Sequence, residues 1–152
     1  MSQRLDWFRA APQGTSALIA VEKYLENCGL EHKLLMLVKL RVSQMNGCAY
    51  CLHMHTADAR KAGESEQRIY LLNAWRESEL YSDRERAALV WAEALTQIAE
   101  SHAPDEVFRL ARSQFSEREL TDLSIAIAMI NLWNRLAVGV RAEHPNDRAA
   151  AA

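Results

Sequence analysis

Cysteine is scarce in this chain of 152 residues, which contains only Cys28, Cys48 and Cys51. An odd count, with two of the three only three positions apart, does not suit the disulfide framework that stabilises small secreted domains. We therefore expect a reducing compartment. A chain of this length buries enough apolar surface to fold as one domain without covalent staples.

An excess of positive charge is also missing, since 18 Lys and Arg residues stand against 20 Asp and Glu residues. This balance argues against a nucleic acid or an anionic membrane as partner, and it favours a small or apolar ligand. Arg4 and Asp6 bring charge where a signal peptide would need an apolar run, and no uninterrupted apolar stretch approaches the length of a membrane span. We expect no membrane partner and a cytoplasmic location.

Strand patterns are absent as well, because valine and isoleucine recur at helical spacing rather than in alternation. The sequence predicts an all-α fold of about six or seven helices with short connections. The expected helices cover approximately 15–29, 31–45, 48–62, 65–75, 82–98, 104–112 and 120–141. We expect 1–14 to form an irregular N-terminal arm, 15–141 a single helical domain, and 142–152 a flexible tail.

Two of these helices carry patterns that bear on assembly. The helix that opens with a capping box at Ser82 has one apolar stripe, with Leu89 and Glu93 on the opposite side. Leu89 is therefore either a contact with another subunit or a single exposed leucine. The last helix, which follows a second capping box at Ser116, is apolar nearly all round. It is predicted to be central in the fold or shared between subunits.

The most informative stretch is 47–55, where Cys48 and Cys51 have Cys-x-x-Cys spacing and His55 follows four positions later. In a helix that begins just after Gly47, Cys51 lies about 300° and His55 about 340° from Cys48 at about 100° per residue. All three side chains then share one helical face, whereas His53 does not. Free amides at a helix start stabilise a thiolate, and His55 can take the thiol proton or pair with the thiolate. The pattern indicates a redox dithiol beside an imidazole.

Other uses of this spacing fit less well. Covalent haem attachment needs a histidine where Leu52 stands, and a thioredoxin fold needs flanking strands. A zinc finger needs its second pair of ligands farther away than His53 and His55. Zinc held by Cys48, Cys51 and His55 with a distant fourth ligand stays open, as does a pair of unreactive core cysteines. Cys28 is expected to be a small buried hydrophobe.

Three stretches together resemble a known family: 43–55 around the Asn-Gly-Cys-x-x-Cys-x-x-x-His core, 82–96, and 131–135. They are similar to the AhpD-like alkylhydroperoxidase branch of the carboxymuconolactone decarboxylase family, and the resemblance extends over about 22–140. It implies an all-helical fold that oligomerises through apolar helices into trimers or hexamers. It also implies a thiol-dependent peroxidase that requires no metal, haem or flavin.

The resemblance assigns a role to each residue of the motif. Cys51 would attack the hydroperoxide and become a sulfenic acid, and Cys48 would resolve it as a disulfide that an external dithiol reduces. His55 would serve as the proton relay. The helix start by itself should activate Cys48 more than Cys51, whereas the nearby His55 favours Cys51.

Two positions depart from the family pattern. Met36 stands where a glutamate is expected, twelve residues before the first cysteine, and Tyr50 stands where a histidine is expected. The candidates to complete the relay are Tyr50 and a carboxylate from elsewhere, Glu93 or Glu85. A lyase acting on a lactone acid and a non-enzymatic redox-sensing oligomer are the alternative functions.

Overall fold

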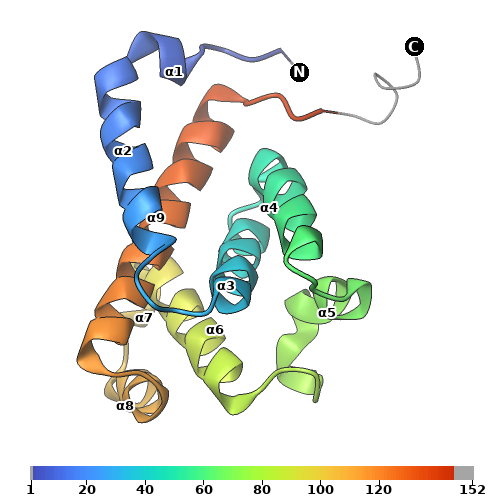
Figure 1. The fold of residues 1–152 in the computed structure, drawn as a ribbon, viewed down its shortest axis with the longest axis vertical. Helices are drawn as coiled ribbons and strands as arrows, with labels where there is room; N and C mark the ends of the chain where they lie inside the picture. The colour runs from blue at the N-terminus through green and yellow to red at the C-terminus, as the bar shows by residue number, and fades with distance from the viewer. Residues whose placement is uncertain (1, 146–152) are drawn as a thin grey trace.

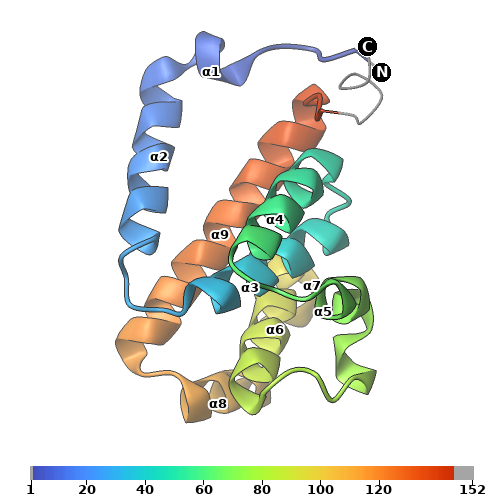
Figure 2. The ribbon, with the colours of Figure 1, turned by 45° about the vertical axis from the view of Figure 1, so that its right-hand side comes forward.

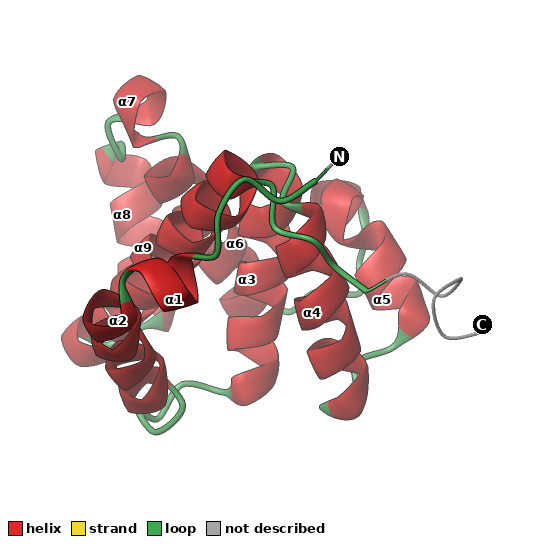
Figure 3. Ribbon diagram, turned by 90° about the horizontal axis from the view of Figure 1, so that it is seen from above, coloured by secondary structure: helices red, strands yellow, loops and turns green. Residues whose placement is uncertain are grey.

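The computed structural model describes residues 2–145, and every regular element in that range is a helix (Figure 1). The elements are α1 (Trp7–Ala10), α2 (Pro12–Leu25), α3 (His32–Met45), α4 (Ala49–Lys61), α5 (Glu66–Leu71), a 3-10 helix η1 (Leu72–Glu77), α6 (Asp83–Thr96), α7 (Ile98–Ser101), α8 (Asp105–Gln114) and α9 (Glu117–Val140). Colouring by secondary structure shows helices and loops only (Figure 3). The all-α prediction is confirmed. The short helices α1 and α7 were not predicted.

The helices gather around α3, which packs against α4, α6 and α9 (Figures 1 and 2). All residues from Leu34 to Leu40 are buried, including Lys39, because α3 has neighbours on most of its circumference. The helix α2 stands on the outer side of the bundle and packs mainly against α1 and α9. This arrangement leaves a space between α2 and the pair α3 and α4, which side chains from all three helices line.

The helix α9 is the one helix in 2–145 that is long and apolar enough to cross a membrane by length and composition. It packs against α2, α3, α4, α6 and α8, which is the environment of a core helix. The prediction of a central helix is therefore confirmed, and its apolar circumference is explained by neighbours on several sides.

Leu89 corrects one expectation from the sequence. It is neither exposed nor left for another subunit, because it is fully buried within this chain. The reason is that α6 has α3, α8 and α9 as neighbours, so its second apolar side faces the interior as well. Its first turn is capped as predicted, with the Ser82 and Glu85 side chains each bonded to the other's backbone amide.

Two of the predicted helix limits need adjustment, and the predicted start of the tail agrees with the structure. Helix α2 begins at Pro12, whose fixed φ suits a first helical position, so the expected boundary between 14 and 15 falls inside α2. The predicted helix 65–75 divides into α5 and η1, with Ala74 outside the helical region. The expected tail starts just after Arg141, which ends α9 with a left-handed conformation. Residues 146–152 lie outside those described.

Gly47, in the turn between α3 and α4, gives a first prediction. Its φ of +63° favours glycine, and an added Cβ would meet no atom within 4 Å. G47A should therefore lower the free energy of unfolding by about 1 kcal/mol through backbone strain alone. The matched control is G139A in the last turn of α9, where an added Cβ also meets no atom within 4 Å. This substitution should raise the free energy of unfolding by about 0.5 kcal/mol. Urea unfolding measures both, and an unchanged midpoint for G47A would contradict the prediction.

Candidate functional site

The dithiol begins at the turn that joins α3 to α4. The sequence predicted that Cys48 lies within the helix. In the structure it is instead the N-cap residue of α4, in an extended conformation. Its Sγ accepts a hydrogen bond from the backbone N–H of Cys51 at 3.3 Å, as a serine or aspartate cap would. Its own N–H donates to the carbonyl of Ser43 at 3.0 Å, so both sides of the residue are tied to neighbouring helices.

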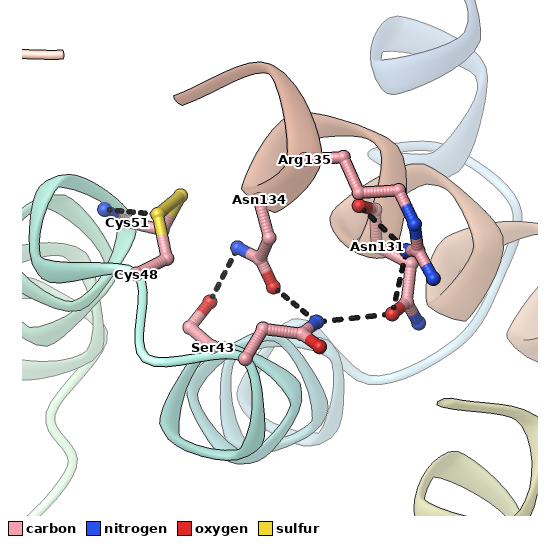
Figure 4. The surroundings of a disulfide bond; sticks show 7 residues. Ser43, Cys48, Cys51, Asn131, Asn134 and Arg135 are labelled. Carbon is pink, nitrogen blue, oxygen red and sulfur yellow. Dashed lines mark hydrogen bonds between the residues drawn. A yellow bond between two sulfur atoms is a disulfide. The ribbon is translucent and has the colours of Figure 1, made fainter. Parts of the chain in front are cut away.

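A network of buried amides holds this turn against α9 (Figure 4). Asn46 Nδ2 donates to Asn134 Oδ1 at 2.9 Å and to Asn131 Oδ1 at 3.0 Å. Asn134 Nδ2 in turn donates to Ser43 Oγ at 3.1 Å. Buried amides that satisfy one another define a single geometry, because any shift would leave a polar group unpaired. Asn131 and Asn134, which contributed to the family resemblance, therefore position the start of α4.

A disulfide joins Cys48 and Cys51, whose Cα atoms lie 5.4 Å apart. Both residues are buried, but only Cys51 lines a cavity of about 640 Å³ together with His55. The walls come from α1, α2, α3, α4 and α9, and most lining residues are apolar. Aromatic side chains contribute much of the surface: Trp7, Phe8, Tyr50 and Trp133. The site can thus hold an apolar molecule against one of the two sulfur atoms.

His55 lies one helical turn after Cys51 and is 7% exposed. Burial lowers its pKa to about 4, and the positive charge of Lys39 acts in the same direction, whereas Asp58 and Glu22 oppose the shift. Its Nδ1 has no hydrogen-bond partner within 2–145, and the nearest carboxylate oxygen, Asp58 Oδ2, is 4.0 Å away. His55 is therefore a neutral imidazole at pH 7, able to accept a proton inside the cavity.

Of the three candidate relay residues Tyr50, Glu93 and Glu85, the structure brings only Tyr50 to the cavity, where its ring meets that of Trp7 edge-on at 6.3 Å. Glu93 lies outside the lining and accepts hydrogen bonds from Trp75 and Arg41. Burial would raise the pKa of Glu93, but these donors and Arg76 hold it below its usual value. Glu93 therefore acts as the anchor of a cluster of donors at some remove from the dithiol.

The other candidates also have partners elsewhere. Glu85 pairs with Arg68 and closes the capping box of α6. His53 is exposed and stacks on the ring of His144 at 5.6 Å, in agreement with its position off the cysteine face. Cys28 is a free, buried cysteine. No group of three His, Cys, Asp or Glu side chains in the described range has the arrangement of a metal site.

Among the charged residues of the cavity wall that the sequence did not indicate, Lys39 and Glu22 form an ion pair. Lys39 Nζ lies 2.7 Å from Glu22 Oε2, and the Trp133 indole donates to Glu22 Oε1 at 2.9 Å. Met36, which occupies the expected position of the glutamate, lines the same wall as an apolar group. The available signal was a lysine three residues after Met36, inside an otherwise apolar run. Its partner could not be found that way, because Glu22 belongs to another helix.

Comparison with known proteins agrees with this fold and site. The sequence profile of the carboxymuconolactone decarboxylase family matches residues 10–94, more than half of the chain, so the chain belongs to this family. The uncharacterized protein YdfG of Bacillus subtilis (strain 168) is 44% identical over 140 residues, which cover 92% of this chain and 95% of YdfG. The predicted membership is confirmed.

Solved structures support the same conclusion. The Agrobacterium tumefaciens protein ATU0492, of unknown function and provisionally assigned to antioxidant defence as an AhpD protein, has a TM-score of 0.93 at 45% identity. The match covers 96% of this chain and all of ATU0492. The debrominase Bmp8 has a TM-score of 0.82 at 20% identity, over 94% of this chain and 77% of Bmp8, and shares the fold. The AhpD-like resemblance is therefore confirmed for the family and fold.

The buried His55 predicts a pH dependence of stability. In the unfolded chain a histidine binds a proton below about pH 6.5, whereas folded His55 does so only near pH 4. The unfolded state therefore holds the extra proton between these values, and stability falls as the pH drops through this window, by up to about 3 kcal/mol. H55Q should lose less of its stability over the same window. Urea unfolding from pH 7 to pH 4 measures the difference.

The control variant is H53Q, since His53 is exposed on the same helix. The free energy of unfolding of H53Q should change with pH in the same way as that of the parent protein. Parallel stability curves for the parent and H55Q would contradict the lowered pKa of His55.

Proposed function

We propose that this protein is a thiol-dependent peroxidase that reduces organic hydroperoxides through Cys48 and Cys51. The observation that carries the proposal is a disulfide-forming pair of which one member, Cys51, lines an apolar cavity beside the neutral His55. Membership of the family and the similarity to ATU0492 support a peroxidase-related activity.

The reaction has three balanced steps. The Cys51 thiolate attacks the terminal peroxide oxygen, the O–O bond breaks, and Cys51 becomes a sulfenic acid while the alkoxide takes a proton to leave as an alcohol. The Cys48 thiol then attacks the sulfenic sulfur and releases water, which forms the disulfide. An external dithiol returns the pair to the reduced state by thiol–disulfide exchange and is itself oxidised.

The geometry supports this division of roles. Cys51 faces the cavity where a peroxide would bind, whereas Cys48 lies outside the lining. Cys48 is nevertheless placed to resolve the sulfenic acid, since the two residues already form a disulfide across one turn. His55 would accept the proton of the Cys51 thiol and return it to the leaving alkoxide, with Tyr50 as the α4 residue that brings a hydroxyl group to the cavity lining.

The cavity also indicates the kind of hydroperoxide. Its walls are mainly aromatic and aliphatic, and its volume of about 640 Å³ is far larger than hydrogen peroxide requires. A bulky apolar organic hydroperoxide fits such a site better than a small polar one. We further propose, from the family resemblance, that copies of the chain associate as trimers or hexamers and that the protein acts in the cytoplasm.

The decisive experiment follows the thiols after treatment with cumene hydroperoxide. The reduced protein has three cysteines, and oxidation should leave only Cys28 free, with the intact mass reduced by two hydrogens. C51S should lose turnover, and C48S should accumulate a sulfenic acid that dimedone traps at Cys51. H55Q should slow oxidation by about 10²-fold. Trapping at Cys48 in C51S would reverse the two roles.

The alternative functions give different results. Turnover of a lactone acid by the C48S/C51S double variant would indicate a lyase, which has no need of the thiols. Oxidation that changes the elution volume in size-exclusion chromatography without catalytic turnover would indicate a redox sensor. Thiols that stay unchanged in excess hydroperoxide would rule out the peroxidase.

A further inference from the structure

An ion pair between a buried lysine and a half-buried glutamate crosses the wall of the dithiol cavity from α3 to α2. Lys39 and Glu22 lie 2.7 Å apart, and their side chains are 11% and 22% exposed. The second Glu22 oxygen accepts the Trp133 indole N–H from α9, so the carboxylate is held from two sides. Side chains from three helices, α2, α3 and α9, thus form one polar cluster at the cavity that Cys51 and His55 line.

Stability gives no sufficient reason for this pair. Removing two charges from water has a large desolvation cost, and well-packed apolar side chains of similar size often stabilise a protein as well or better. The neighbouring wall positions on α3, Leu35 and Met36, are in fact apolar. A charge kept among such neighbours points to a role in the chemistry of the cavity.

Cys51 shares the cavity with ionisable groups from three helices, while α1 and α9 contribute only uncharged side chains. Besides His55, these groups are Glu22 on α2 and Glu26 directly after it, His32 and Lys39 on α3, and Tyr50, Asp58 and Lys61 on α4. The Lys61 side chain is 79% exposed and is therefore screened by water. Lys39 is the cation among them whose side chain is buried, so its charge acts most strongly within the cavity.

The charge of Lys39 already affects the site in the oxidised protein. It is the second cause, after burial, of the low pKa of His55, so the imidazole is neutral before it accepts a proton and places no permanent positive charge beside Cys51. Reduction of the disulfide creates a thiol at Cys51 whose ionisation adds a negative charge to the same apolar space. A nearby ammonium favours the ionised form of such a group and lowers its pKa.

We propose that Lys39 is the positive charge that stabilises the Cys51 thiolate, and that Glu22 positions Lys39 and moderates its effect. The proposal rests on the role of Cys51 as the attacking thiol in the proposed function. Lys39, one turn after Met36 on α3, is then the charged partner of the dithiol, and Glu22 on α2 supplies the opposite charge. Lys39 and Glu22 act through the electrostatics of the cavity and are positioning residues.

Two substitutions that break the same ion pair should have opposite effects on the Cys51 thiol. K39M removes the cation and should raise the pKa of Cys51 by about one unit or more. E22Q removes the counter-charge but keeps an oxygen for the Trp133 indole, so the pKa of Cys51 should fall. K39R keeps the positive charge, so the pKa of Cys51 in this variant should stay within about half a unit of its value in the parent protein.

The measurement uses the full-length reduced protein in a C48S background. The rate of iodoacetamide alkylation at Cys51 is followed from about pH 5 to about pH 10 by peptide mass spectrometry, which separates Cys51 from Cys28. K61M is the matched control, because Lys61 is an exposed cation of the same cavity, and its effect should be much smaller than that of K39M. The double variant E22Q/K39M leaves no unpaired charge and keeps the test available if K39M does not fold.

In that double variant the pKa of Cys51 should exceed that of E22Q, because the ammonium is the only further difference. Shifts of K39M and E22Q in the same direction, or no shift in either, would overturn the proposal, since a purely structural pair would give those results. Alkylation involves no peroxide, so a failure of the peroxidase function would leave this measurement unaffected. If the protein is an active peroxidase but K39M and E22Q leave the pKa of Cys51 unchanged, the role of Lys39 is refuted and the proposed function is not.

Discussion

The hydrogen bonds between Asn46, Asn134 and Ser43 determine where α3 ends and α4 begins, and the dithiol depends on that point. A turn with a left-handed glycine places Cys48 at the N-cap, so that Cys51 is the first cysteine within the helix. If the amides were not satisfied within the fold, α4 could begin elsewhere and the two sulfur atoms would lose their shared turn. The position of the dithiol is therefore set in part by Asn131 and Asn134 of α9.

The same constraint separates the two cysteines by environment. Both are equally buried, and their spacing alone would not distinguish them. Cys48 is fixed by backbone contacts to the turn, while Cys51 is presented to an apolar space with a neutral histidine one turn away. The helix-start argument favoured Cys48 and the histidine argument favoured Cys51; the structure adds that Cys51, and not Cys48, lines the cavity.

Local patterns in the sequence predicted the helices, both capping boxes, the shared face of Cys51 and His55, and the exposed position of His53, because these depend on residues a few positions apart. They could not predict the burial of Leu89, since the neighbours on its side of α6 come from distant segments. The Glu22–Lys39 pair and its bond to Trp133 span 17 and 111 residues, respectively, along the chain. Periodicity carries no information on such contacts, so the sequence could not indicate that Glu22, and not Glu93, lines the cavity.

The cavity wall is formed by central helices on one side and by outer helices on the other. Cys51, His55 and Lys39 belong to α3 and α4, at the centre of the fold, whereas the opposite wall is formed by α1 and α2, which pack mainly on each other and on α9. Substitutions at outer positions such as Phe8 and Ile19, both exposed, disturb few core contacts. The shape of the cavity can therefore be altered from the first twenty or so residues at a smaller cost in stability than from α3 or α4, where the same side chains also fill the core.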